Sequence, residues 1–581
     1  MEQEAARYVN AEKGVEDVEQ ALSGAGDILA EEISDSAQIR SRLREYLQKN
    51  AQISTTKGTK ENQIYDMYSE YSESVRRIAP HRILAIDRGE REEALKVSVE
   101  IDQQVCIGMI ENQVINRNSP FAKALHEVCE DSFKRLIFPS LERELRAQLT
   151  EKACAQAIGV FSENLKNLLM QPPVKGKVTM GLDPGYRMGC KVAVVDGTGK
   201  VLDTAVVYPT YGERQKNEAI AALATLIKKH GVEHIAIGNG TASRETEQMA
   251  VELIRQVGGG VSYMMVNEAG ASVYSASKLA AEEFPEYDVN LRSAVSIARR
   301  MQDPLAELVK IDPKAIGVGQ YQHDMPQKRL DETLSGVVED CVNAVGVDVN
   351  TASASLLGRV SGLNATTARN IVKYREENGA FTGRRQLLKV PKLGPKAFQQ
   401  SAGFLRVPES KSVLDNTGVH PESYAAAQGL LDLCGYTLAD VSAGNLAALP
   451  DKIKALGEES VARQLDIGVP TLRDIVAELM KPGRDVREDL PKPILRTDVL
   501  EMKDLKPGME LTGTVRNVID FGVFVDIGVH QDGLVHISQV ADKFIRHPSE
   551  VVSVGDVVKV VVLDVDEKKK RISLSMRQAK S

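Results

Sequence analysis

The chain has 581 residues and a formal net charge of −8. That length allows several domains, each with its own hydrophobic core. No apolar run approaches the ~18 residues of a membrane span, and no export signal opens the chain. The six cysteines are scattered without a CxxC pair, which argues against a zinc site or a disulfide framework. We therefore expect a cytoplasmic, multidomain protein with no metal centre, no cofactor and no membrane partner.

The first 171 residues have a mostly helical pattern. Apolar residues recur at three- and four-residue spacing in segments such as VEDVEQALSGAGDILAEEI and FAKALHEVCEDSFKRLI. Residues 82–101 (RILAIDRGEREEALKVSVEI) are an exception, and a short hairpin is expected there. We see no catalytic or binding motif in this part of the sequence, so a helical scaffold over 1–171 is predicted.

A break at Gln171-Pro172-Pro173 precedes a different pattern over 174–322. Three strands follow one another (VTMGLDPG, CKVAVVD, VLDTAVVYP), and helices then alternate with the strands HIAIGN and VSYMMVNE. This order predicts an α/β domain with a mixed sheet. The order and the opening strand resemble the RNase H-like superfamily, specifically its YqgF/RuvC-like branch.

Nucleases of that superfamily hold two divalent ions with carboxylates at strand and helix ends. The resemblance matches Asp183 to the first carboxylate and Asp303 to the late one. Where the middle carboxylate should end the strand HIAIGN, Gly238 and Asn239 stand, and an amide holds Mg²⁺ poorly. Glu268, on another strand, is a candidate stand-in. A binding fold without catalysis is predicted, with Asp183, Glu268 and Asp303 as vestigial residues. A metal-dependent nuclease, or an enzyme resembling a Holliday-junction resolvase, stays as the alternative.

The region 330–408 contains two similar helical hairpins in a basic stretch, although the chain as a whole is acidic. Their turns are Gly362-Leu363-Asn364 and Lys392-Leu393-Gly394. A turn that leads into a helix presents backbone N–H groups to an anion. Asn364 tolerates a left-handed conformation, whereas Lys392 does so less readily. Both segments resemble the helix-hairpin-helix DNA-binding motif in its tandem form. The phosphate-binding residues predicted here are Gly362, Asn364, Gly394, Arg369, Lys373, Arg384, Arg385 and Lys396.

Another helical domain is expected over 409–495, and a small all-β barrel over 503–578. In the barrel, short β-branched runs alternate with glycine and aspartate turns. Phe521, Phe524 and His536 form a candidate stacking platform for unpaired bases. Strand side chains three apart point to opposite faces, unless a bulge at Gly522 brings the two phenylalanines together. The basic residues predicted to assist are Arg516, Lys559 and Arg571. The segments GTVRNVIDFGVFVDIG, DGLVHIS and RISLSMR resemble the S1 RNA-binding domain, an OB-fold.

The fold class predicted for the whole chain is multidomain α+β. It combines a helical scaffold, an RNase H-like α/β domain, a tandem helix-hairpin-helix and a C-terminal S1 barrel. This order, together with DPGYRMGCKVAVVD and QDPLAELVKIDPKAIGVGQYQHDM, resembles the Tex family of bacterial transcription accessory proteins. In that family a further N-terminal helical segment precedes the point where this chain starts.

The resemblance implies a non-enzymatic factor that binds RNA and DNA with little sequence preference and modulates gene expression. The expected partners are single-stranded RNA or DNA and, as a further option, duplex DNA. A scaffold that docks on RNA polymerase or the ribosome is a second alternative, and a monomer is expected.

Overall fold

The computed structural model describes residues 1–116, 119–317, 319, 321–483, 485–490, 493–497, 505–519, 521–529, 531–545, 548–553, 556–566 and 569–579, without the side chain of residue 549. The chain divides into two compact units, Met1–Phe161 with Gly319–Leu330, and Ser162–Val318 with Asp331–Ser581. Position 503, the predicted start of the barrel domain, lies outside the described residues. Within the described ranges, no helix is both long and apolar enough to cross a membrane.

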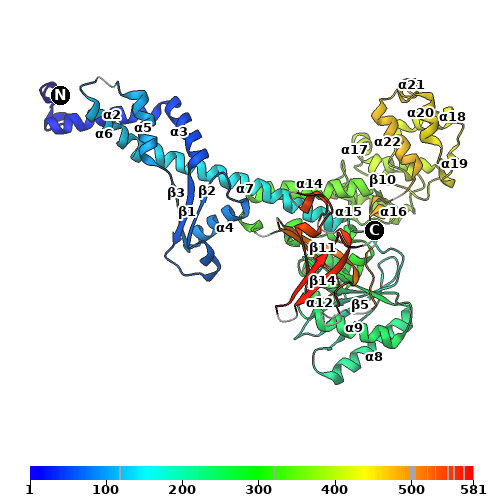
Figure 1. The fold of residues 1–581 in the computed structure, drawn as a ribbon. Helices are drawn as coiled ribbons and strands as arrows, with labels where there is room; N and C mark the ends of the chain where they lie inside the picture. The colour runs from blue at the N-terminus through cyan, green and yellow to red at the C-terminus, as the bar shows by residue number, and fades with distance from the viewer. Residues whose placement is uncertain are drawn as a thin grey trace. The chain divides into compact units, whose positions relative to one another are not determined.

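The first unit combines helices with a small antiparallel sheet in the order β2-β1-β3, which lies in the blue part of the ribbon (Figure 1). The strands are β1 (Gln52–Lys57), β2 (Glu70–Ser74) and β3 (Leu95–Glu100). The hairpin expected over 82–101 is wrong, because helix α4 (Pro80–Arg91) fills the first half and β3 pairs with β1. Pro80 starts α4 with the φ that a first helical turn requires, and Ile83 and Ile86 are both buried.

The other helices of this unit begin at polar caps. Asp17, Ser36 and Asp102 accept hydrogen bonds from backbone N–H groups in the first turns of α2, α3 and α5. Their bounds, with those of the remaining helices, are α1 (Glu2–Ala5), α2 (Val18–Asp35), α3 (Ala37–Asn50), α5 (Gln103–Val114), α6 (Ala122–Asp131) and α7 (Phe138–Leu169). The long helix α7 continues the chain into the second unit.

The second unit contains a five-stranded mixed sheet in the order β6-β5-β4-β7-β8. Its strands are β4 (Thr179–Asp183), β5 (Cys190–Val195), β6 (Val201–Val207), β7 (His234–Gly238) and β8 (Ser262–Val266). The pairs β4–β5 and β5–β6 are antiparallel, whereas β4–β7 and β7–β8 are parallel. This arrangement confirms the mixed α/β sheet predicted from the sequence.

Helices cover both faces of this sheet, and the central strands β4, β5 and β7 are buried along almost their whole length. Met180, Leu182 and Ile235 pack with α8 (Glu213–His230) and α9 (Ser243–Val257) on one face (Figure 1). Ala193 and Val195 pack with α12 (Val289–Gln302) on the other. Gly181 lets α12 approach closely, since a Cβ at this position would collide with the Ala294 carbonyl.

Three short helices follow the sheet strands or flank α12, namely α10 (Ala271–Ser275), α11 (Lys278–Glu283) and α13 (Pro304–Leu308). The longer helix α14 (Gln327–Val345) comes next. The double hairpin follows, with α15 (Ala354–Leu357), α16 (Ala365–Asn378) and α17 (Pro395–Ser401). A parallel pair of two-residue strands, β9 (Val347–Asp348) and β10 (Leu405–Arg406), joins the two ends of this region.

Five more helices then build a separate hydrophobic core around Leu430, Leu449 and Ile475. They are α18 (Tyr424–Cys434), α19 (Leu438–Ala443), α20 (Leu449–Leu456), α21 (Glu458–Gln464) and α22 (Val469–Met480).

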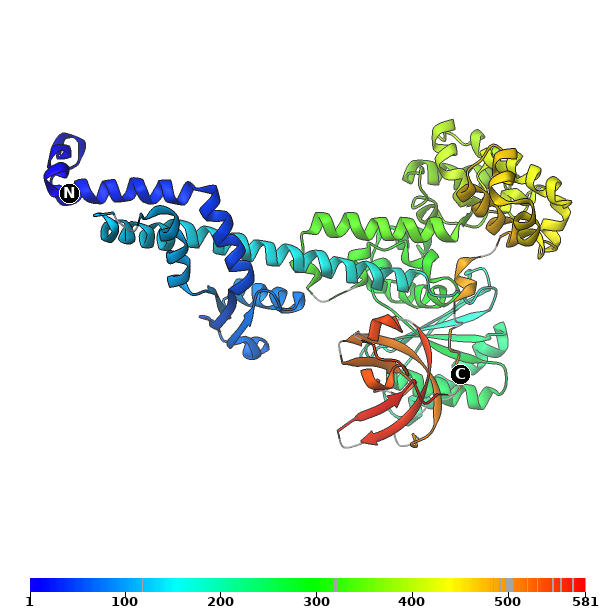
Figure 2. The same cartoon turned by 45° about the horizontal axis from the view of Figure 1, so that its top comes forward.

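The C-terminal strands form a closed barrel in the order β11-β12-β13-β15-β14, drawn in orange to red (Figure 2). The strands are β11 (Glu510–Ile519), β12 (Gly522–Asp526), β13 (Gly533–His536), β14 (Val557–Asp566) and β15 (Arg571–Ser575). Alternate valines, such as Val523 and Val525 on β12, fill the interior and leave the intervening positions outside.

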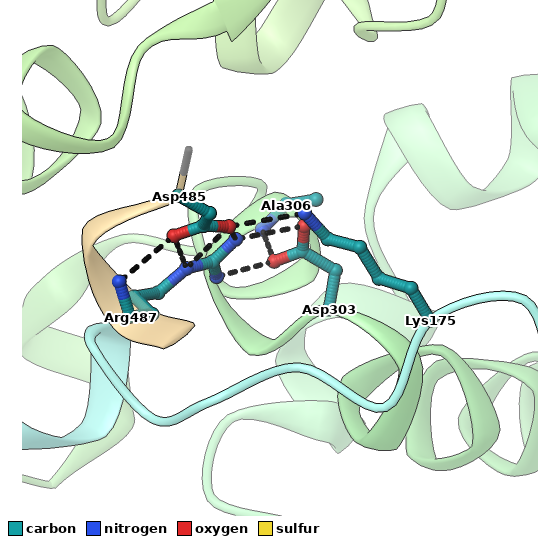
Figure 3. Close-up of polar contacts among 5 residues, drawn as sticks. All are labelled: Lys175, Asp303, Ala306, Asp485 and Arg487. Carbon is teal, nitrogen blue, oxygen red and sulfur yellow. Dashed lines mark hydrogen bonds and ion pairs between the residues drawn. The ribbon is translucent and has the colours of Figure 1, made fainter. Parts of the chain in front are cut away.

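The segment between the last helix and the barrel is anchored by a buried guanidinium (Figure 3). Arg487, 1% exposed, donates from Nη1 to Oδ1 of Asp303 at 2.8 Å and from Nη2 to Oδ2 of Asp485 at 2.7 Å. Lys175 Nζ lies 3.0 Å from the same Asp485 oxygen. Asp303 also caps α13 by accepting from Ala306 N–H at 3.2 Å. Three distant segments of the chain therefore meet at one charge cluster.

A second anchor follows directly along the chain. Arg496 exchanges two backbone hydrogen bonds with Tyr263 on the edge strand β8, at 2.8 and 2.9 Å. Its side chain lies 3.7 Å from Asp526 of the barrel. The segment therefore adds a short antiparallel bridge to the exposed edge of the sheet.

The pKa of Asp485 gives the anchor a pH dependence. Burial alone would raise this pKa, but the hydrogen bonds and charge of Arg487 outweigh it and lower the pKa to about 2. A depressed carboxyl pKa adds stability above the unfolded value of 3.8, and that stability is lost as pH falls below it. We predict that Asp485→Asn lowers the local opening free energy of residues 485–490 by about 2 kcal/mol at pH 7.

Hydrogen exchange of those amides measures this effect, with the exposed neighbour Glu488→Gln as the matched control. The difference between Asp485→Asn and the wild type should shrink as pH falls from about 5 to 3. A difference that is the same at both pH values, or an equal effect of Glu488→Gln, would contradict the assignment.

Candidate nucleic-acid interface

Two of the three predicted stacking residues lie on the outer face of the barrel. Phe524 and His536 share this face, because Gly522 pairs with His536 and Phe524 pairs with Leu534 in the β12–β13 register. Phe521 lies just before β12, where its carbonyl accepts from Ile537 N–H at 2.9 Å, and its side chain is 53% exposed. Phe524 is half-buried and His536 is exposed. All three rings are therefore reachable from solvent.

The bulge considered at Gly522 is located elsewhere. The β11–β12 register shifts between Val515 and Asn517, so Arg516 is the additional residue. Its Nη2 lies 2.7 Å from Asp526 and its Nε 3.7 Å from Asp532. Against the effect of burial, Arg516 holds the pKa of Asp526 below its usual range. A phosphate at Arg516 would therefore compete with two carboxylates.

Lys559 and Arg571 are exposed, and neither forms an ion pair within the described part of the chain. Lys559 pairs with Thr512 in the β11–β14 register, and Arg571 with Asp566 in the β14–β15 register. They are the two predicted barrel cations that are not already engaged by a carboxylate.

The two hairpin turns have closely similar backbones. Gly362 (φ +83°) and Lys392 (φ +66°) both adopt the left-handed conformation as the first residue of their turns. The expectation that Asn364 adopts that conformation is wrong, since its φ is −132° and it caps α16. Its Oδ1 accepts from the N–H groups of Thr366 and Thr367, whereas Gly394 offers α17 no side-chain cap. Lys392 tolerates its conformation at a cost of about 1–2 kcal/mol.

Most of the predicted hairpin residues lie on the surface. The exposed members are Gly362, Asn364, Arg369, Lys373, Arg385, Gly394 and Lys396. Lys373 makes only a loose pair with Glu377 at 3.6 Å, and Arg385 and Lys396 have no ion pair among the described residues. The second turn therefore presents a basic surface with free side-chain donors.

Arg384 is the exception and requires a correction. It is 1% exposed, and its guanidinium donates to the carbonyls of Leu405 (2.8 Å) and Val419 (2.7 Å), to that of Thr417 and to the Tyr424 hydroxyl (2.7 Å). All of these acceptors are internal, so Arg384 joins the double hairpin to the following helical core. It does not face a phosphate.

In the α/β domain, two of the three candidate carboxylates come together. Asp183 ends β4, and burial followed by the charge of Glu268 raises its pKa to about 6. Lys191, its register partner on β5, acts in the opposite direction. Glu268 reaches over the end of β7, because a Cβ on Gly238 or Gly240 would collide with its carboxylate. Burial raises the pKa of Glu268 as well.

A buried arginine, which the sequence did not single out, faces the same place. Arg300 is 3% exposed and donates to the carbonyls of Asn267 and Ala269 at 2.7 and 2.8 Å, on either side of Glu268. Burial lowers its pKa to about 10. Among the buried side-chain atoms without a hydrogen-bond partner in the described residues are Glu268 Oε2 and both Nε and Nη2 of Arg300. The positive charge of Arg300 therefore lowers the pKa of Glu268 and partly offsets the effect of burial.

Asp303 does not belong to this cluster, so its assignment beside Asp183 is wrong. Gln302, its neighbour on α12, donates to the carbonyl of Lys177, which precedes the first residue of β4. Asp183 is the last residue of β4, and at about 3.3 Å per residue the two ends lie roughly 15–20 Å apart. Asp303 is held instead by Arg487 (Figure 3). Within the described ranges, no three His, Cys, Asp or Glu side chains are grouped to hold a metal.

Comparison with known protein families assigns a model to each part of this arrangement. The matches are "Tex central region-like" (residues 1–161), "Tex protein YqgF-like domain" (177–302), "Helix-hairpin-helix motif" (342–406), "HHH domain" (412–487) and "S1 RNA binding domain" (504–577). The closed barrel and the paired hairpins thus define the chain as a multidomain nucleic-acid-binding protein.

Several relatives match almost the whole chain. YdcI of Bacillus subtilis (strain 168) is 52% identical over 575 residues, covering 98% of this chain and 80% of the relative. The "Transcriptional accessory protein Tex" of Neisseria gonorrhoeae is 50% identical over 580 residues (98% and 75%). The human "S1 RNA-binding domain-containing protein 1" is 38% identical over 637 residues (97% and 64%). The chain belongs to the Tex family.

The contrast between Arg384 and Arg385 gives a matched pair of variants. Arg384→Met removes a buried network of hydrogen bonds and should destabilise the protein by about 3 kcal/mol. Arg385→Met should leave stability unchanged and reduce the salt slope of duplex DNA binding by about one. Thermal unfolding and binding titrations at several salt concentrations measure the two effects. An unfolding temperature lowered by Arg385→Met and unchanged by Arg384→Met would contradict this assignment.

Proposed function

We propose that this protein is an accessory factor of transcription that binds nucleic acid at two chemically different surfaces and catalyses no reaction. The barrel stacks unpaired bases of RNA or DNA, and the double hairpin holds phosphates of a strand or a duplex. The name of the Neisseria gonorrhoeae relative, "Transcriptional accessory protein Tex", supports the role in transcription. The proposed location of this role is the cytoplasm.

The observation that carries the proposal is the outer face of the barrel. Phe524 and His536 share this face, Phe521 is exposed just before β12, and the unengaged cations Lys559 and Arg571 occupy exposed strand positions. Aromatic stacking contributes about 1–3 kcal/mol per base and accepts any base, because every base has a π-face. Little sequence preference follows from such contacts.

The hairpins supply the complementary chemistry. The exposed second turn with Lys392, Gly394 and Lys396 offers charge and backbone N–H groups to phosphates, which carry no base identity. This binding should weaken steeply with salt through the release of counterions.

The absence of catalysis is proposed from the charges around Asp183. Asp183 and Glu268 both have raised pKa values, and the buried Arg300 acts on Glu268, whereas a two-metal nuclease needs an array of carboxylates that attracts cations. The test is incubation of labelled single-stranded RNA, single-stranded DNA and duplex DNA with and without Mg²⁺ or Mn²⁺. Shifted, intact bands are expected. Cleavage that disappears in Asp183→Asn would instead establish the nuclease.

The barrel residues give a prediction of their own. The double variant Phe521→Leu, Phe524→Leu keeps apolar bulk but loses both aromatic faces, so single-strand affinity should fall at least about tenfold. Duplex binding at the hairpins should change less than twofold. Fluorescence anisotropy on both ligands measures this, with Phe544→Leu, which removes a 91% exposed ring outside the barrel strands, as the control. Equal losses on both ligands would contradict the division between the two surfaces.

A further inference from the structure

A second group of exposed rings lies on the α/β domain, outside the barrel and the hairpins. Tyr186 (47% exposed) and Met188 (64%) belong to the turn between β4 and β5, and Tyr208 (45%) and Tyr211 (53%) to the loop between β6 and α8. Cys190 pairs with Val207, so the two loops meet at one edge of the sheet, the edge at which Asp183 ends β4. We call these four residues the tyrosine patch.

Ring packing and hydrogen bonds fix the side chains of the tyrosine patch in place. The rings of Tyr208 and Tyr211 pack edge to face with centroids 5.7 Å apart. The Tyr211 hydroxyl donates to the carbonyl of Arg187 at 3.0 Å, and the Tyr186 hydroxyl donates to Glu245 at 3.0 Å. The Tyr208 ring lies against Gly189, where a Cβ would collide with it. The structure thus fixes these rings while leaving about half of each in solvent.

Such exposure is uncommon in this chain. The exposed aromatic side chains of the described residues are Tyr8, Phe121, Tyr186, Tyr208, Tyr211, Phe521 and Phe544. Three of these seven share one small patch. A cluster of exposed aromatic residues marks an interaction site more strongly than single exposed rings do.

Three exposed arginines are close in sequence to residues of the tyrosine patch or to its partner Glu245. Arg187 and Arg244 are exposed and have no ion pair within the described ranges. Arg214 pairs only with Glu218 on its own helix, at 3.0 Å with both side chains largely in solvent, a contact of little energy. Exposed aromatic faces interleaved with free guanidinium groups are the combination that binds unpaired bases together with their phosphates.

The first turn of α9 connects the tyrosine patch to the barrel. Ser243 lines a cavity of about 320 Å³ together with Asn239 and with Arg516, Gln531 and Asp532 of the barrel. Glu245, two residues further along the same turn, holds Tyr186. One turn of α9 therefore contributes Ser243 to the cavity beside the barrel and Glu245 to the tyrosine patch.

We propose that the tyrosine patch is a second stacking site for single-stranded nucleic acid, occupied by the same strand that occupies the barrel. This inference rests on the proposed function, because it requires the barrel to bind a single strand. The edge of the sheet that ends in Asp183 then guides a strand by stacking on Tyr186, Tyr208 and Tyr211.

The test compares two triple variants of the full chain. Tyr186→Leu, Tyr208→Leu, Tyr211→Leu removes the aromatic faces, and Tyr186→Phe, Tyr208→Phe, Tyr211→Phe keeps them without the hydroxyls. Each is titrated with an oligouridine of about 6 nucleotides, which the barrel alone can cover, and with one of about 30 nucleotides. The leucine variant should bind the long ligand about tenfold more weakly and the short ligand equally well. The phenylalanine variant should bind both like the wild type.

Photocrosslinking provides a readout that does not depend on the variants folding. With 4-thiouridine in the long ligand, the wild-type protein should crosslink at peptides that contain Tyr186, Tyr208 or Tyr211. Unchanged long-ligand affinity in the leucine variant, or no crosslink at those peptides, would each overturn the inference. If the wild type binds neither oligonucleotide, the proposed function itself fails, which is a distinguishable result.

Discussion

One buried guanidinium, that of Arg487, joins distant segments of the second unit. Its two carboxylate partners, Asp303 and Asp485, come from segments far apart in sequence. Lys175, which pairs with Asp485, belongs to a third segment. A buried ion pair gains little net stability over well-packed apolar residues, but removing one partner leaves an uncompensated buried charge. The arrangement therefore specifies where residues 485–490 must lie. From there the chain reaches the edge of β8, where Arg496 forms the bridge to Tyr263.

Buried and exposed cations have different roles in this acidic chain. Buried arginines serve the fold: Arg384 binds four internal oxygen atoms, and Arg300 offsets the carboxylate of Glu268. Exposed cations such as Arg385, Lys396 and Lys559 are left without carboxylate partners in the described ranges. Cations that are free at the surface can replace counterions on a phosphate backbone, whereas cations that are already paired cannot do so without losing their partner. The net charge of −8 thus conceals small basic surfaces.

The sequence predicted the elements whose periodicity is simple. The five strands of the α/β sheet and the valine-rich barrel strands were identified because an apolar run between turns has few alternatives. The segment 82–101 was misread, since ILAI fits a buried strand as well as a helix, and only the pairing of β3 with β1 decides between them. Lys392 takes a left-handed backbone conformation because the surrounding turn imposes it, and residue type alone does not reveal this.

The candidate sites were harder to predict, for two physical reasons. Arg384 and Arg385 are adjacent and chemically identical, and only the packing of the following helical core buries one of them. Asp303 follows the helix that resembles the family pattern, but the direction of α12 across β4 places it at the opposite end from Asp183. The spacing of residues along the sequence does not reveal in which direction α12 crosses β4. The tyrosine patch was missed because its four members are brought together by the β5–β6 register rather than by a motif.

The most direct test of the two-surface account is the salt dependence of binding by the wild-type protein. Affinity for single-stranded RNA and for duplex DNA would be measured across a series of salt concentrations. Stacking at the barrel should leave a salt-resistant part of the single-strand affinity, so the duplex should show the steeper slope of log K against log salt. Parallel slopes with no salt-resistant part would mean that phosphates alone are recognised, and would contradict the stacking role of the barrel.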